Sequence, residues 1–251
     1  MVNMNKDKVR DLFDSISKRY DMTNSIISLG LETIWRRQFL KRINSSDKKI
    51  LDICCGTGTS TYQIWLKNRD AVVSGIDFSE EMISIAKNKY GKITNLIFHS
   101  SDVDDLDLAE NTFDCITMVF GIRNISKRGK VLRGLNKFLK DSGSIIILEF
   151  NYLENGFFSH LFRFYLNRVM PLVGGCLTGN RWVYRYLART IKEFPGPEEF
   201  KKLMGNAGWE SIKHFPLTFG ICSIFVGCKR PFREPGSSQD PVSEQALPEP
   251  D

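Results

Sequence analysis

The sequence lacks three features that would assign it to common functional classes. No apolar run approaches the roughly 18 residues that a membrane-spanning helix needs. The six cysteines form no C-x-x-C pair, which argues against a disulfide framework or a thiolate metal site. Only three histidines are present, and they are scattered along the chain, so we expect no metal site.

The amino terminus also lacks the character of a targeting segment. Residues 1–14 read MVNMNKDKVRDLFD, and this charged, acid-containing stretch argues against a signal peptide and a transit peptide. The sequence therefore predicts a cytoplasmic protein.

Charge is distributed unevenly along the chain. The net charge is +6, but residues 231–251 contain one basic and five acidic side chains, so the remaining body is more basic than the total suggests. The same tail holds five of the nine prolines, which predicts a disordered, acidic extension. Because nothing before it has the composition of a linker, residues 1–230 are predicted to form one domain. A basic body favours an anionic partner.

Acids are absent from the segment 155–192. Six cationic side chains and many aromatic ones occupy it instead. Its first part shows apolar residues at helical spacing from Phe158 to Val169, which predicts an amphipathic helix. We expect residues 154–194 to form a helical lid. Its arginines and aromatics suit an anionic membrane surface, and a helix that only packs on the sheet is the alternative.

A glycine-bracketed turn follows the first apolar run, 50–53. Gly56, Thr57 and Gly58 form this turn, a second apolar run spans 72–76, and Asp77 comes directly after it. Strand, glycine loop, helix, strand and acid in this order predict the nucleotide-binding half of a doubly wound α/β sheet. Asp77 then stands at a strand end where it can accept both hydroxyls of a ribose.

Further apolar runs complete the predicted sheet. We expect strands at 96–98, 113–119 and 144–150, and a closing hairpin at 209–214 and 221–227. Residues 7–42 are predicted to be helical, Ser79 to cap the helix after Asp77, and a helix to run through Leu139.

The glycine loop resembles the D-x-x-x-G-x-G loop of class I methyltransferases, which bind S-adenosylmethionine. Other strings are more specific: YDMTN (20–24), FGIRN (120–124), LEF (148–150) and YRYLARTIKEFP (184–195). With the loop they resemble the UbiE/MenG family of C-methyltransferases of menaquinone and ubiquinone biosynthesis over roughly residues 8–228. The resemblance implies a Rossmann-like, seven-stranded, mostly parallel sheet. It also implies a helical cap over residues 1–45 and a helical insertion after the fifth strand.

The resemblance implies a cofactor site and no metal. S-adenosylmethionine would be held by the loop residues Gly56, Thr57 and Gly58, and Asp52 would bind its ammonium group. Asp77 would bind the ribose and Asp102 the adenine amino group. Three neighbours of these residues complete the expected site: Phe78, Val103 and Val119. The product would be S-adenosylhomocysteine.

The same resemblance implies methylation of a prenylated quinol on a ring carbon, from demethylmenaquinol to menaquinol or on the ubiquinone precursor. Arg123 would stabilise the phenolate, and Asn124 would hold a quinol oxygen. Tyr20 and Asp21 would close the site or relay the proton. A salt bridge to the acidic loop 101–107 is the alternative for Arg123, and helix packing is the alternative for Tyr20.

Two departures from the family pattern lie near these sites. Family members usually carry histidine where Glu32 stands, which puts a general-base role at that position in doubt. They usually carry aspartate where Thr59 stands, and Thr59 is predicted to act as a hydroxyl cap for its helix instead.

Other functions remain open from the sequence. The protein would meet a polyprenyl quinol at the inner face of a membrane, so we expect peripheral binding to an anionic membrane surface. Whether the chain forms a homo-oligomer is left open. The string Phe120-Gly121-Ile122-Arg123 replaces the N-P-P-Y-like tetrad common for amino-group targets, which weighs against nucleic acid as a partner. The alternatives are a non-catalytic scaffold of a quinone-making complex and a methyltransferase for another small or nucleic-acid substrate.

Overall fold

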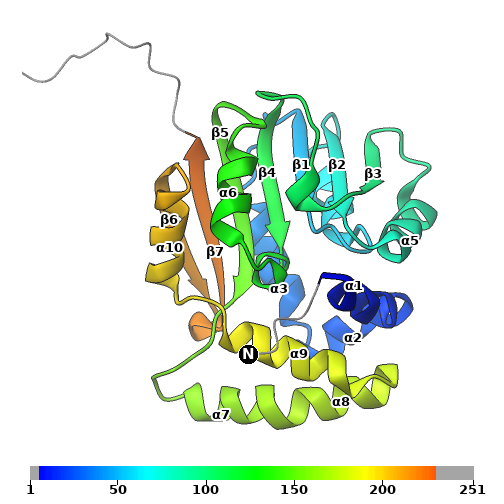
Figure 1. Cartoon of the computed structure of the whole chain (residues 1–251), viewed down its shortest axis with the longest axis vertical. Helices are drawn as coiled ribbons and strands as arrows, with labels where there is room; N and C mark the ends of the chain where they lie inside the picture. The colour runs from blue at the N-terminus through cyan, green and yellow to red at the C-terminus, as the bar shows by residue number, and fades with distance from the viewer. Residues whose placement is uncertain (1–5, 230–251) are drawn as a thin grey trace, which may run out of the picture.

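A computed structural model describes residues 6–229, and its centre is a seven-stranded sheet (Figure 1). The strand order is β3-β2-β1-β4-β5-β7-β6, with β7 antiparallel to both of its neighbours and the first five strands parallel. The strands are β1 (Lys49–Ile53), β2 (Val72–Asp77), β3 (Leu96–Ser100), β4 (Phe113–Val119), β5 (Leu139–Phe150), β6 (Trp209–Leu217) and β7 (Cys222–Lys229). The predicted mostly parallel sheet is confirmed.

Helices cover both faces of this sheet. One face packs against α3 (Leu31–Leu40), α4 (Thr59–Lys67) and α5 (Glu80–Tyr90). The other packs against α6 (Arg128–Asn136) and α10 (Pro197–Asn206). Because both faces are covered, the central strands are apolar along nearly their whole length, as in β4 and the second half of β5.

The remaining helices gather beyond the carboxyl ends of the parallel strands (Figure 1). The cap consists of α1 (Lys6–Asp14), α2 (Tyr20–Ile27) and the start of α3. The lid consists of α7 (Ser159–Phe164), a π-helical stretch (Tyr165–Val169), α8 (Met170–Thr178) and α9 (Arg181–Lys192). Cap and lid share a separate apolar cluster in which Ile16 and Ile27 meet Leu166, Met170 and Tyr184.

Local chemistry explains one boundary that the sequence predicted. Ser79 has extended backbone angles and its hydroxyl accepts a hydrogen bond from the Met82 amide at 3.0 Å. This satisfies one of the free amides at the start of α5, so the predicted helix cap is confirmed.

Two other local predictions were wrong. Gly58, not Thr59, is the capping residue of α4, and the Thr59 hydroxyl donates to Asp21 instead. The helix predicted to run through Leu139 ends at Asn136, because Leu139 already pairs with Phe113 at the start of β5. Pairing within the sheet overrides the helical spacing of a single leucine.

Two further predictions concern the C-terminal tail and membrane-spanning helices. The disordered tail predicted for residues 231–251 lies outside the described residues. Within residues 6–229, no helix combines the length and hydrophobicity needed to cross a bilayer.

The contact between α8 and α9 predicts a sensitive position. A methyl group on Gly174 would lie 2.5 Å from the Tyr184 ring, which is fully buried, whereas one on Gly134 in α6 would meet nothing within 4 Å. Gly174→Ala should therefore lower the free energy of unfolding by about 1–3 kcal/mol. Gly134→Ala, the matched control, should leave it unchanged or raise it by up to about 1 kcal/mol. Denaturant titration measures both, and equal stabilities would contradict the tight packing.

Candidate active site

Two cavities lie side by side beyond the carboxyl ends of the strands. The larger one, here the apolar cavity, has a volume of about 370 Å³ and is lined by cap, lid and sheet-end residues such as Trp35, Phe150 and Phe162. The smaller one, the loop cavity, measures about 120 Å³ and lies over the glycine loop and the ends of β2 and β4. Tyr20 and Phe120 line both cavities, so a group held in one can meet a group held in the other.

Asp77 ties the glycine loop to the end of β2. Its carboxylate accepts the Gly56 amide at 2.9 Å and the Ser79 amide at 3.0 Å. Burial raises the pKa of Asp77 to about 6, although these amides oppose the shift. Gly56, Asp77 and Phe78 all line the loop cavity, and the lone pairs of the Asp77 carboxylate that the amides do not use can accept a ligand hydroxyl.

Asp52 lies elsewhere than the sequence analysis expected. It is fully buried and does not line the loop cavity. Thr117 stands beside it in register on β4, and the hydroxyls of Thr117 and Thr61 donate to its two oxygens at 2.7 and 2.8 Å. Burial raises the pKa of Asp52 to about 6. In this structure Asp52 therefore joins β1, β4 and α4 from within.

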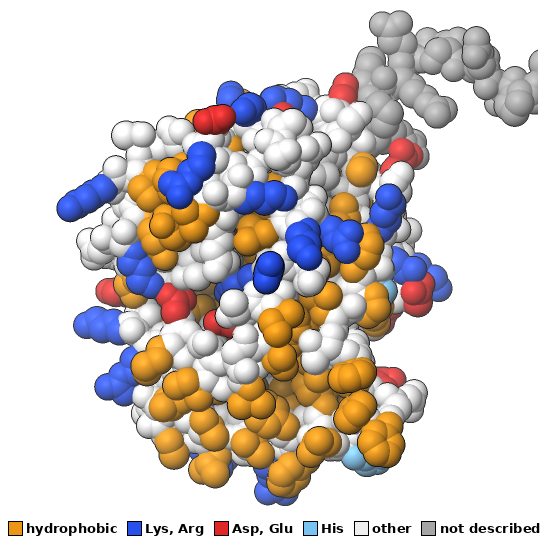
Figure 2. Space-filling view, turned by 180° about the vertical axis from the view of Figure 1, so that it is seen from behind, with side chains coloured by type: hydrophobic (Ala, Val, Ile, Leu, Met, Phe, Trp, Pro, Cys, Tyr) orange, Lys and Arg blue, Asp and Glu red, His pale blue; other side chains and the backbone are white. Residues whose placement is uncertain are grey.

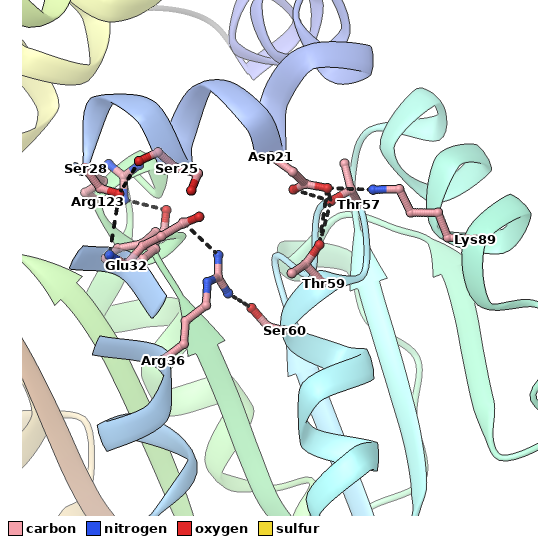
Figure 3. A network of polar contacts seen from close by, with 11 residues as sticks. Asp21, Ser25, Ser28, Glu32, Arg36, Thr57, Thr59, Ser60, Lys89 and Arg123 are labelled. Atoms are coloured by element: carbon pink, nitrogen blue, oxygen red, sulfur yellow. Dashed lines mark hydrogen bonds and ion pairs between the residues drawn. The ribbon is translucent and has the colours of Figure 1, made fainter. Parts of the chain in front are cut away.

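Asp21 also differs from the expected arrangement. Figure 3 shows its carboxylate turned toward the glycine loop, where it accepts hydrogen bonds from the hydroxyls of Thr57 and Thr59. Lys89 of α5 completes the group with an ion pair of 2.6 Å. Asp21 lines neither cavity, so it fastens the cap to the loop. Thr57 and Gly58 likewise lie outside the loop-cavity lining.

The far side of the loop cavity is formed by the segment after β3. Asp102 and Val103 line it, as does Val119 from the end of β4. Burial alone would raise the pKa of Asp102, but the Asp104 amide and the Lys6 ammonium together hold it below its ordinary value. No motif marked Lys6, because it reaches this acid from α1, far away in the chain.

Arg123 forms a buried ion pair at the wall of the apolar cavity. Its guanidinium lies 2.7 Å from Glu149, the acid of the LEF string, and both side chains are almost inaccessible. The Arg123 amide also donates to Glu149, and the guanidinium donates to the Phe120 carbonyl. The alternative partner, the acidic loop 101–107, is therefore wrong. A buried pair of this kind holds its geometry because loss of either partner leaves an uncompensated charge.

Tyr20 lies between the two cavities, and Asn124 lies at the wall of the loop cavity. Burial raises the pKa of the Tyr20 phenol, so it stays protonated, and its ring packs edge-on against Phe13. Asn124 lines the loop cavity, and its side-chain oxygen is buried without a hydrogen-bond partner in the described chain. A buried acceptor without a partner costs free energy, which a ligand donor or an ordered water would offset. The residues around the loop cavity thus fit a polar ligand such as S-adenosylmethionine.

Glu32 contributes a carboxylate to the apolar cavity. It lies on α3, and its nearest cation is Arg36 one turn later, at 3.7 Å (Figure 3). Burial raises the pKa of Glu32, and the charge of Arg36 only partly offsets this. Asn24, the last residue of the YDMTN string, and Ser28 of the cap also line the cavity, and the sequence analysis assigned neither of them a role.

The buried ion pair yields a stability prediction. Arg123→Met should lower the free energy of unfolding by about 3–5 kcal/mol, because Glu149 would remain charged in an apolar wall. Adding Glu149→Leu should recover at least half of that loss, since both charges are then gone. Arg37→Met, at an exposed position on α3, is the control and should change little. Denaturant titration of the four proteins would contradict the pairing if the double variant were less stable than Arg123→Met.

Comparison with known proteins agrees with this geometry. A family model described as the ubiE/COQ5 methyltransferase family matches residues 1–229. The ubiquinone/menaquinone biosynthesis C-methyltransferase UbiE of Geotalea daltonii is 35% identical over 228 residues, which cover 89% of this chain and 97% of that protein. The demethylmenaquinone methyltransferase of Thermus thermophilus is 35% identical over 218 residues, with coverage of 86% and 99%.

Solved structures share the fold. One from Thermotoga maritima, described as an S-adenosylmethionine-dependent methyltransferase and possible histamine N-methyltransferase, matches with a TM-score of 0.62. It covers 88% of this chain and 99% of that one at 16% identity, which shows the fold alone. The sequence match, the methyltransferase sheet and the paired cavities agree: this chain belongs to the ubiE/COQ5 methyltransferase family.

Proposed function

We propose that this chain transfers a methyl group from S-adenosylmethionine to a ring carbon of a prenylated quinol in respiratory quinone biosynthesis. Demethylmenaquinol is the first candidate substrate, and the benzoquinol precursor of ubiquinone is the second. One observation carries the proposal: an apolar cavity of about 370 Å³ adjoins a loop cavity, and Tyr20 and Phe120 line both. The names of the relatives from Geotalea daltonii and Thermus thermophilus support the same reaction.

The loop cavity supplies the groups that would hold the cofactor. Asp77 would accept ribose hydroxyls with its remaining lone pairs, and the unpaired oxygen of Asn124 would accept a further donor. Asp102 and Val103 would border the adenine. When bound, S-adenosylmethionine supplies a methyl group that its sulfonium charge already activates. The protein's task is then to orient the ring carbon, exclude water and manage the quinol proton.

The apolar cavity suits a flat ring with a hydrocarbon chain. Trp35, Phe120 and Phe150 form one aromatic wall, with ring centroids of Phe120 and Phe150 4.6 Å apart and those of Trp35 and Phe150 5.5 Å apart. Arg123 lies over both phenylalanine rings and is the cation of this wall. Its buried guanidinium would favour negative charge on a quinol oxygen, although Glu149 shares that charge.

The mouth of this cavity supports docking to a membrane. Leu29, Leu161 and Phe219 line the cavity and are also highly exposed, at 78%, 66% and 78%. Phe157 beside them is 92% exposed. Figure 2 shows hydrophobic side chains gathered over the end of the molecule that the cap and lid form. An exposed apolar patch around a cavity mouth is suited to insertion at a membrane interface, where a prenyl tail would be drawn from the bilayer.

The alternative functions are less well supported. A non-catalytic scaffold would not need two adjoining cavities, one of them bordered by a polar acceptor without a partner in the described chain. A nucleic-acid substrate would require a polar, basic entrance, whereas exposed apolar residues surround this one.

The function is tested by methyl transfer in solution. The purified protein should move a labelled methyl group from S-adenosylmethionine to reduced demethylmenaquinol with a short tail. Asp77→Ala should weaken cofactor binding about ten- to a hundredfold in calorimetry, as expected for lost hydrogen bonds to a carboxylate. Circular dichroism would verify that the variant is folded. Unchanged affinity would remove Asp77 from the site, and absent transfer by the parent would reject the function.

Membrane docking gives a separate prediction. The parent should bind anionic vesicles, and binding should weaken as salt rises, because basic residues near an anionic surface contribute up to about 1 kcal/mol each. Replacing Arg163, Arg168, Arg181 and Arg185 with glutamine should abolish this binding while activity on a short-tailed quinol survives. A control variant carries glutamine at four exposed lysines outside the lid: Lys92, Lys127, Lys130 and Lys202. If both variants bind as the parent does, the lid is only a roof over the cavity.

A further inference from the structure

The apolar cavity contains one group able to take a proton from a quinol. Among the described residues that line it, Glu32 is the only acid and Arg123 the only base. Arg123 is always protonated and its guanidinium is paired with Glu149, so it cannot accept a proton. Asp21, which with Tyr20 was expected to close the site or relay the proton, points to the glycine loop and does not line this cavity.

The phenols of the cavity are also unsuited to this task. Burial raises the pKa values of Tyr20 and Tyr165, so both are protonated near neutral pH. The Tyr165 hydroxyl already donates to the Ile27 carbonyl. Asn24 and Ser28 carry an amide and a hydroxyl, neither of which is a base at this pH.

Arg36 holds the Glu32 carboxylate in place but does not form a close ion pair with it. Its carboxylate stands 3.7 Å from the Arg36 guanidinium, which is longer than a normal hydrogen bond. Arg36 in turn donates to the Ser60 hydroxyl of α4 and lies over the Phe120 ring. Figure 3 shows Arg36 between Glu32 and α4, so the pair is braced against the helix that follows the glycine loop.

We propose that Glu32 is the proton acceptor for the quinol hydroxyl during methyl transfer. This inference rests on the proposed function. As the hydroxyl proton passes to a Glu32 oxygen, electron density moves to the adjacent ring carbon, which forms the new carbon–methyl bond. The electron pair of the broken sulfur–carbon bond stays on sulfur. The ring carbon then loses its hydrogen as a proton to water, and Glu32 returns its proton to the ring oxygen.

The electrostatic surroundings suit this role. Two charges act on Glu32: Arg36 on α3 favours its ionised form, and Asp21 on α2 opposes it. Tyr20 on α2 and Arg123 after β4 line the same cavity. Burial raises the pKa of Glu32 above that of a solvated glutamate, which makes its ionised form a stronger base. Because only the ionised form accepts a proton, turnover should rise with pH through this raised pKa and then level off.

Turnover of a short-tailed demethylmenaquinol provides the first test. Glu32→Gln should lower kcat about a hundred- to ten-thousandfold with little change in cofactor affinity, as expected on losing a general base. Glu32→His should restore part of the rate, with the rising limb of the pH profile moved toward the ordinary histidine value of about 6.5. Glu199→Gln, the same change at an exposed position on α10, is the control. Equal rates in Glu32→Gln and Glu199→Gln would overturn the proposal.

A second test needs neither cofactor nor turnover. A nitrophenol with a geranyl chain, whose phenolate absorbs visible light, is bound to the apo protein and titrated. A nearby Glu32 carboxylate opposes phenolate formation, so Glu32→Gln should raise the ionisation constant of the bound probe at least about threefold. An unchanged titration curve would overturn the proposal. If the parent transfers no methyl group, the proposed function fails, while this titration still decides whether Glu32 faces the ring hydroxyl.

Discussion

The buried ion pair between Arg123 and Glu149 is the interaction on which the shape of the site depends. It joins the segment after β4 to the carboxyl end of β5 at the wall of the apolar cavity. Because neither charge can be left unpaired in this wall, the backbone that carries Phe120 and Phe150 is fixed with it. The aromatic wall, and hence the space for a quinol ring, follows from that constraint.

A polar cluster ties the cap to this frame, and the lid is held to the cap by apolar packing and by hydrogen bonds such as that from Tyr165 to the Ile27 carbonyl. Asp21 binds the hydroxyls of the glycine loop and the Lys89 ammonium, which couples α2 to the loop that would carry the cofactor. The lid instead packs on the cap through buried residues such as Leu166 and Tyr184. The two cavities are therefore covered by one continuous layer. Its exposed apolar rim is what the proposed docking to a membrane requires.

Glu32 shows how a departure from a family pattern can be interpreted only in three dimensions. In the sequence it is a substitution that casts doubt on a general base. In the structure it is the only acid among the described residues that line the apolar cavity, and it is braced by Arg36, while the Asp21 carboxylate is hydrogen-bonded to the glycine loop. The proposed proton transfer thus falls to a residue whose role as a general base the family pattern had put in doubt.

The sheet, the glycine loop, the position of Asp77 and the Ser79 cap could be predicted from the sequence, because they depend on local periodicity and on short turns. The partners of Asp21 and Arg123 became visible only in the folded chain, since they come from elements far apart in the sequence. The tertiary structure also showed that Asp52 is internal, because strand register placed Thr117 beside it. Residue type and order indicate which groups are present, whereas packing decides which of them face a cavity.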